Sequence, residues 1–67
     1  MSLKSILCNY IVEQYNVPLN DLLQIAQKNN YKESNCERRL RELRKDGKVV
    51  GVMKDGVVVG YKYNFDF

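Results

Sequence analysis

Histidine is absent from the 67-residue sequence, and cysteine occurs only as Cys8 and Cys36. Structural zinc sites take four ligands drawn mainly from cysteine and histidine, so the sequence excludes a zinc site of ordinary composition. A catalytic thiol needs a neighbouring base, most often histidine, and the chain has no histidine. We therefore expect no metal and no cofactor, and we expect Cys36 to be a small core residue.

The usual marks of an enzyme are also missing. The sequence has no glycine-rich phosphate loop, no carboxylate pair placed for acid–base chemistry and no nucleophile beside a base. Such arrangements carry much of hydrolytic and phosphoryl-transfer chemistry. We therefore expect that the protein is not an enzyme and has no small-molecule substrate.

Long apolar runs and low-complexity tracts are absent as well. No stretch approaches the ~20 apolar residues that a membrane span needs, and the mixed stretch after Lys4 is unlike the apolar block of a signal peptide. From these absences we expect no membrane partner and an intracellular location, in the cytoplasm or the nucleoid. A chain of this length forms one small domain, 1–67.

What the sequence does have is positive charge gathered in its middle third. The whole chain carries a net charge of +3, yet residues 28–48 hold eight basic and four acidic side chains, a net charge of +4. Residues 1–27 sum to −1 and residues 49–67 to zero. Concentrated positive charge is an electrostatic footprint for polyanions such as nucleic acids.

Apolar residues at helical spacing predict three helices, at about 3–15, 21–28 and 34–46. The expected N-caps are Ser2, Asn20 and Ser34, the last in a capping box with Glu37. Asn29-Asn30 and Asp46-Gly47 are expected to end the second and third helices in the left-handed conformation. The predicted core comprises Leu7, Tyr10, Leu22, Ile25, Ala26, Leu40 and Leu43, and Cys36 joins the inner stripe of the third helix.

After Gly47 the pattern changes to the period of a strand and is rich in valine and tyrosine. Asp55-Gly56 is a strong signal for a two-residue hairpin turn. The predicted cross-strand pairs are Lys54–Val57, Val52–Val59, Gly51–Gly60 and Val50–Tyr61. This register puts Val50, Val52, Val59 and Tyr61 on the more apolar side, unless a bulge near Gly51 or Gly60 changes the facing.

Three short helices and a hairpin form an α+β pattern that resembles the winged helix-turn-helix family over nearly the whole chain. The most specific segment is 39–49, RLRELRKDGKV, with leucine, two residues, leucine, three residues, glycine and then an aliphatic residue. Segment 17–23, VPLNDLL, is similar to the family's entry to its second helix. The resemblance implies a helix-turn-helix core, a two-stranded wing and a buried Val49. A small stand-alone member of this kind is similar to bacteriophage or mobile-element proteins.

The resemblance further implies a transcriptional or recombination regulator that binds double-stranded DNA. Helix 34–46 would lie in the major groove and wing 49–63 on the flanking backbone. Arginine suits base edges and phosphates because its planar fork donates two parallel hydrogen bonds. The expected DNA-binding residues are Lys32, Ser34, Asn35, Arg38, Arg41, Lys45, Lys48 and Lys54.

Two other interpretations of the charged helix stay open. Pairs four residues apart, Glu37–Arg41 and Arg38–Glu42, would make a merely solvated face, although each contributes only ~0.2–0.5 kcal/mol. Acidic residues interleaved with the arginines favour instead a winged-helix module that binds a partner protein and not DNA.

Leftover apolar residues predict either a homodimer or packing within one chain. A straight strand puts Tyr61, Tyr63, Phe65 and Phe67 on one side. The first helix carries a second apolar stripe, Cys8, Val12 and Tyr15, which turns away from the main apolar face of that helix. These two strips either cover each other or form a two-fold interface. The interface residues would be Cys8, Val12, Tyr15, Phe65 and Phe67.

Overall fold

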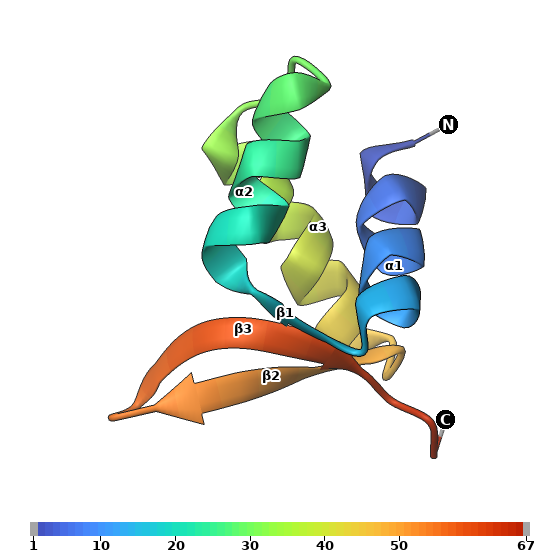
Figure 1. Cartoon of the computed structure of the whole chain (residues 1–67), viewed down its shortest axis with the longest axis vertical. Coiled ribbons are helices and arrows are strands. Elements are labelled where there is room, and N and C mark those ends of the chain that lie inside the picture. The colour runs from blue at the N-terminus through green and yellow to red at the C-terminus, as the bar shows by residue number, and fades with distance from the viewer. Residues whose placement is uncertain (1, 67) are drawn as a thin grey trace.

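Helices and strands are interleaved along the chain, and the computed structural model describes residues 2–66 of it. The elements are α1 (Leu3–Gln14), β1 (Asn16–Pro18), α2 (Leu19–Lys28), α3 (Glu33–Lys45), β2 (Val49–Lys54) and β3 (Val57–Tyr63). The three helices lie on one side of the sheet, with α3 behind α1 and α2, and the β2–β3 hairpin projects past α2 (Figure 1). The α+β class and the three helices are confirmed, but the sheet has a third strand that the sequence did not predict.

The first helix begins where the sequence predicts. Ser2 is its N-cap, and the Ser2 hydroxyl accepts a hydrogen bond from the Ser5 N–H at 3.2 Å. This bond satisfies one of the free N–H groups of the first turn. The helix ends one residue earlier than predicted, because Tyr15 adopts a positive φ of 67°.

The second and third helices begin before their predicted N-caps. Pro18 precedes α2 and Lys32 precedes α3, both in extended conformation and without a side-chain capping bond. The predictions of Asn20 and Ser34 as N-caps, and of a capping box, are therefore wrong. The fixed φ of proline allows a helix to start directly after β1, and Glu33 in the first turn of α3 is favoured by the positive end of the helix dipole.

Each of these helices is followed, two residues after its end, by the predicted residue in the left-handed conformation. Asn30 has a φ of 65° and Gly47 a φ of 80°. After α3, the N–H groups of Gly47 and Lys48 donate to the carbonyls of Arg44 and Leu43, each at 3.1 Å. This is the Schellman pattern, which satisfies the free carbonyls of the last turn.

The sheet is antiparallel, in the order β1-β3-β2. The unpredicted strand β1 pairs Val17 with Tyr61 and Pro18 with Gly60, and Val17 is 1% exposed. Gly60 allows this pairing, since a Cβ atom at that position would lie 2.6 Å from the Val17 carbonyl oxygen. A glycine in a strand often marks such a close approach of another backbone.

The hairpin turns at Asp55-Gly56, as predicted, with positive φ at both residues. Lys54 pairs with Val57 as predicted. The other three predicted pairs are wrong by one residue. The observed pairs are Met53↔Val58, Val52↔Gly60, Gly51↔Tyr61 and Val50↔Lys62, with a bulge that leaves Val59 without a partner.

The bulge beside Gly60 decides which side chains enter the core. Because it adds one residue to β3 only, both Val49 (2% exposed) and Tyr61 (5% exposed) face the helices. Val50 and Val59 are exposed and Val52 is half-buried, so the facing predicted for these three valines is wrong. The sequence allowed a bulge near Gly51 or Gly60. The bulge observed beside Gly60 puts Val49 and Tyr61 on the same side of the sheet, so both residues are buried as expected.

The core lies between the helices and the inner face of the sheet. Five predicted members, Leu7, Leu22, Ala26, Leu40 and Leu43, are buried, as is Cys36. Tyr10 and Ile25 are only partly buried and pack against this cluster. The remaining members of the hydrophobic core are Leu3, Ile11, Val17, Val49 and Tyr61. No helix within residues 2–66 is long and apolar enough to cross a membrane.

Candidate nucleic-acid interface

The face of α3 that points away from the core carries a row of polar and basic side chains. Ser34, Arg38, Arg41 and Lys45 recur at one helical turn or the next, so they share this outer face. All four are exposed, whereas the opposite stripe, Cys36, Leu40 and Leu43, is buried. We call these four residues the α3 row.

The acidic side chains of α3 do not neutralise the α3 row. Glu42 accepts a hydrogen bond from Arg39 at 3.1 Å and lies 4.0 Å from the Lys4 ammonium of α1. Neither the Glu37–Arg41 pair nor the Arg38–Glu42 pair is formed within residues 2–66. The positive charge of the row is therefore left without a partner inside the described part of the chain.

Lys4 holds the acidic groups on the α1 side of the helix. Its ammonium donates a hydrogen bond to the Asp46 carboxylate at 2.9 Å. This bond, reinforced by the attraction between the two opposite charges, lowers the pKa of Asp46 and raises the pKa of Lys4. Residues 42 apart in the sequence are thus paired, and both acids face α1, not the α3 row.

Four of the eight predicted DNA-binding residues lie outside the row. Lys32 precedes α3 and is exposed at its N-terminal end. Asn35 lines a groove beside Lys4, Tyr31 and Arg39, on the α1 flank of the helix. Lys48 borders a hollow with Lys4, Ser5, Cys8 and Asn9 of α1. Lys54 ends β2 at the tip of the hairpin. The structure therefore gathers only part of the predicted set on one face.

Arg44 is a basic residue of α3 that is not among the predicted DNA-binding residues. It is exposed, and its side chain reaches β2, since a Cβ atom on Gly51 would lie 3.3 Å from its Nη1 atom. Arg44 lines a groove between α3 and the hairpin with Gly47, Gly51, Met53 and Asn64. The sequence signal for this contact is Gly51 in the facing strand, because a residue without a side chain leaves room for the arginine.

The groups with possible catalytic or metal-binding chemistry do not assemble. Cys36 is 0% exposed and donates a weak hydrogen bond from Sγ to the Leu22 carbonyl at 3.6 Å. Burial, with smaller contributions from Glu37 and Glu33, raises the pKa of the Cys36 thiol to about 11, so it stays protonated near neutral pH. No group of three or more His, Cys, Asp or Glu side chains within residues 2–66 is placed to hold a metal ion.

Only Tyr15 and Phe65, of the residues predicted for a dimer interface, are brought together within residues 2–66. Tyr15 and Phe65 are 64% and 63% exposed, and Val12 is 40% exposed. The Tyr15 and Phe65 rings are in contact, with centroids 5.3 Å apart, whereas Cys8 is half-buried against the core. Phe67 lies outside the described residues. The straight strand predicted to carry four rings ends at Tyr63.

Comparisons of the chain with protein-family models, with curated proteins and with solved structures give no match. Function is therefore inferred from the chain's own side chains. Two surfaces stand out within residues 2–66: the α3 row, with its unneutralised cations, and the exposed aromatic rings beside Phe65.

Proposed function

We propose that this chain is a winged helix-turn-helix domain that binds double-stranded DNA, as a small transcriptional or recombination regulator. In this proposal α2 and α3 are the helix-turn-helix pair, α3 enters the major groove, and the β2–β3 hairpin is the wing. The order of three helices and a projecting hairpin (Figure 1) supports this assignment. The short strand β1 extends the sheet, on the edge of β3 opposite β2.

The α3 row is the observation that carries the proposal. Arg38, Arg41 and Lys45 are exposed on one face, and no ion pair within residues 2–66 involves them. A solvated face of paired charges would have used Glu37 and Glu42 for this purpose. Instead Glu42 is occupied by Arg39 and Lys4, so the row offers net positive charge to a polyanion.

Each residue of the row has a role suited to its chemistry. Arg38 and Arg41 lie mid-helix, and we assign them to base edges in the major groove or to phosphates. Ser34 and Lys45, at the two ends of the row, bind the phosphates that flank the groove and fix position without reading sequence. Lys54 at the hairpin tip reaches the neighbouring backbone.

Fluorescence anisotropy of a labelled random duplex, titrated over a series of salt concentrations, tests the proposal. If about four phosphates are neutralised, log affinity falls against log salt with a slope of roughly −3 to −4. If both arginines contact phosphates, Arg38→Ala with Arg41→Ala should make that slope less steep by about two. The same double substitution should weaken binding by ~1–3 kcal/mol for each arginine that hydrogen-bonds a base edge.

Lys62→Gln is the matched control. It also removes one positive charge. Lys62 belongs to the hairpin, but it lies at the end of β3 remote from the tip, paired with Val50 and Asn16 and away from α3. It should change the affinity less than either arginine substitution does. No binding at low salt, or equal effects of all three substitutions, would refute DNA recognition by the α3 row.

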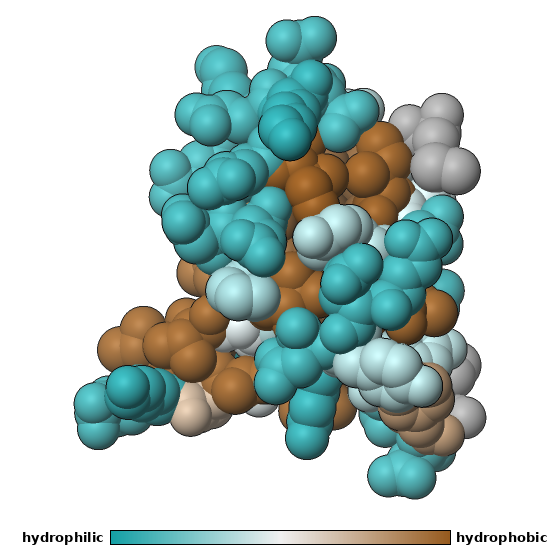
Figure 2. Space-filling model, in the orientation of Figure 1, coloured by the Kyte–Doolittle hydropathy of each residue, from teal (hydrophilic) through white to brown (hydrophobic). Residues whose placement is uncertain are grey.

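The second candidate is a module that binds a partner protein, and the hairpin favours it. Met53 is 55% and Val57 is 63% exposed, and Figure 2 shows apolar surface along the hairpin. Lys54 is the only cation in the β2–β3 hairpin up to Tyr61. If duplex DNA does not bind, this apolar hairpin becomes the candidate interaction surface.

A further inference from the structure

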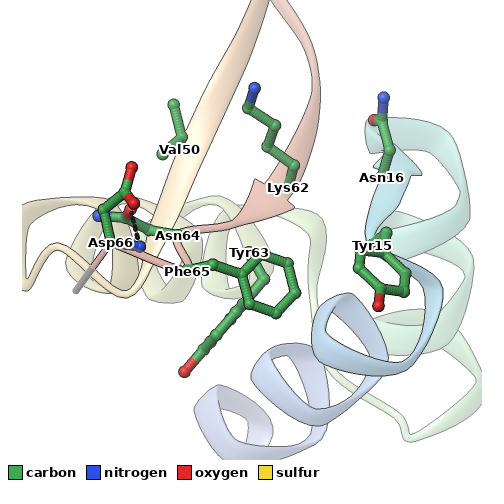
Figure 3. A pocket seen from close by; sticks show the side chains of 8 residues that line it. All are labelled: Tyr15, Asn16, Val50, Lys62, Tyr63, Asn64, Phe65 and Asp66. Atoms are coloured by element: carbon green, nitrogen blue, oxygen red, sulfur yellow. Dashed lines mark hydrogen bonds between the residues drawn. The ribbon is translucent and has the colours of Figure 1, made fainter.

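Three aromatic rings meet at the end of the sheet remote from the hairpin turn. The Phe65 ring lies between the other two, with its centroid 5.3 Å from that of Tyr15 and 4.9 Å from that of Tyr63. Figure 3 shows Tyr63 edge-on to Phe65, the arrangement that aromatic pairs prefer. These rings join the end of α1 to the segment after β3.

Packing of the rings on one another leaves two of them exposed, whereas Tyr63 is half-buried against the core. Tyr15 and Phe65 remain 64% and 63% exposed. Burial of such large aromatic side chains is strongly favourable, because each removes a large apolar area from water. Val50, which lines the hollow beside Phe65, is 38% exposed. We call Tyr15, Val50, Tyr63 and Phe65 the aromatic patch. Such a cluster on a small chain marks an interaction surface more often than scattered apolar residues do.

One charge of each sign borders the aromatic patch. Lys62 and Asp66 both line the hollow beside Phe65, and both are exposed. No ion pair joins them or involves either of them within residues 2–66, and their charged ends lie apart in Figure 3. The surface is therefore apolar at its centre with a cation and an anion at its edge.

We propose that the aromatic patch binds a second copy of this chain in a two-fold dimer. A two-fold interface is self-complementary: where one residue of the first copy meets another residue of the second, the reverse pairing also forms. The apolar centres then cover each other, and Lys62 of each copy faces Asp66 of the other. A surface with one cation and one anion at its edge satisfies this pairing with itself, whereas the cationic α3 row does not.

The size of the patch sets the strength of the dimer. A standard interface buries ~800 Å² on each partner, about one sixth of the 4710 Å² surface of this chain. The four part-exposed side chains of the patch supply less than that. We expect a weak dimer, with a dissociation constant on the order of 100 µM. The proposal does not depend on DNA binding.

Sedimentation equilibrium of the full chain without DNA, up to a concentration of about 1 mM, tests the proposal. We expect the mass to rise from monomer to dimer over this range. Phe65→Ser and Tyr15→Ser should each keep the chain monomeric. Val57→Ser, which changes an equally exposed side chain of the hairpin, should leave the dimer unchanged. Because all three side chains are exposed, circular dichroism should show an intact fold.

Charge reversal tests the pairing itself. Lys62→Glu places two acidic groups opposite each other, Asp66→Lys places two basic groups opposite each other, and each variant alone should dimerise less. Mixed together, the two variants should form a heterodimer at least as well as the unaltered chain dimerises with itself, since acid then meets base at both ends.

Any one of three results would overturn the proposal. The first is a monomer throughout the concentration range, and the second is a dimer that Phe65→Ser does not weaken. The third is a mixture of the two charge variants that associates no better than either variant alone. A monomer that still binds duplex DNA would leave the proposed function standing, so the two failures are distinguishable.

Discussion

Replacing Gly60 by alanine should separate β1 from the sheet. The added Cβ atom would lie 2.6 Å from the Val17 carbonyl oxygen and 3.4 Å from the Val17 carbonyl carbon and the Pro18 Cα atom. All three atoms belong to the backbone, so no side-chain rotation relieves the clash. Either β1 moves outward or β3 bends, and in both cases the pairing of Pro18 with Gly60 is broken.

The expected loss of stability follows from what β1 buries. Forcing an extra carbon into a packed site costs about 1–3 kcal/mol, and expelling a buried valine such as Val17 costs about 1.5–3 kcal/mol. These are alternative responses to one clash, so we expect Gly60→Ala to reduce the free energy of unfolding by roughly 2–3 kcal/mol. A chain of 67 residues has about 3–10 kcal/mol in total. The melting temperature should therefore fall by roughly 10–20 °C.

Gly51→Ala is the matched control, because it makes the same chemical change on the neighbouring strand. Its Cβ atom would meet the side chain of Arg44 most closely, at 3.3 Å, and that flexible arginine can move aside. We expect this variant to stay within about 0.5 kcal/mol of the unaltered chain. Urea and thermal unfolding followed by circular dichroism measure both. Equal stability of the two variants would refute the close approach of β1 to Gly60.

Two further predictions concern pairs and burial around α3. Because the pKa of Asp46 is lowered in the folded state, its pairing with Lys4 stabilises the fold above the unfolded pKa of about 3.9 and is lost as the pH falls through the folded-state pKa. Lys4→Met should raise the pKa of Asp46 towards that ordinary value in a carboxyl NMR titration, and an unchanged pKa would contradict the pairing. Cys36, whose pKa burial raises to about 11, should resist thiol reagents at about pH 8 in a Cys8→Ser background until urea unfolds the chain, and rapid labelling of the folded protein would contradict its burial.

Local patterns in the sequence were sufficient for the helices and for the hairpin turn. In each helix the apolar residues, such as Leu7 of α1 and Leu40 of α3, repeat at the helical period. This repeat predicts both a helix and the face that the helix buries. Asp55-Gly56 specifies a turn through the positive φ that its two residues tolerate. These features depend on near neighbours in the chain, so no knowledge of the tertiary fold was needed.

The candidate site was only partly predictable. Helical spacing puts Ser34, Arg38, Arg41 and Lys45 on one side of α3, and the structure exposes all four. Sequence spacing also suggested that Glu42 pairs with Arg38, but Glu42 lies near Lys4 instead. That pairing joins two residues far apart in the sequence, and it depends on how α1 packs against α3. Helical spacing alone carries no information of this kind.

The sequence by itself determined three helices, the turn of the hairpin and the outward row of polar and basic residues, because each depends on residues that are near neighbours in the chain. Only the tertiary structure decided the strand β1, the bulge at Val59 and the pairing of Lys4 with Asp46. A three-residue strand is too short to show a period, and it exists because Val17 is buried where β3 offers an open edge. The bulge forms because Val49 and Tyr61 can both reach the core only if β3 gains one residue over β2. These features arise from packing between segments far apart in the chain, which a local pattern does not specify.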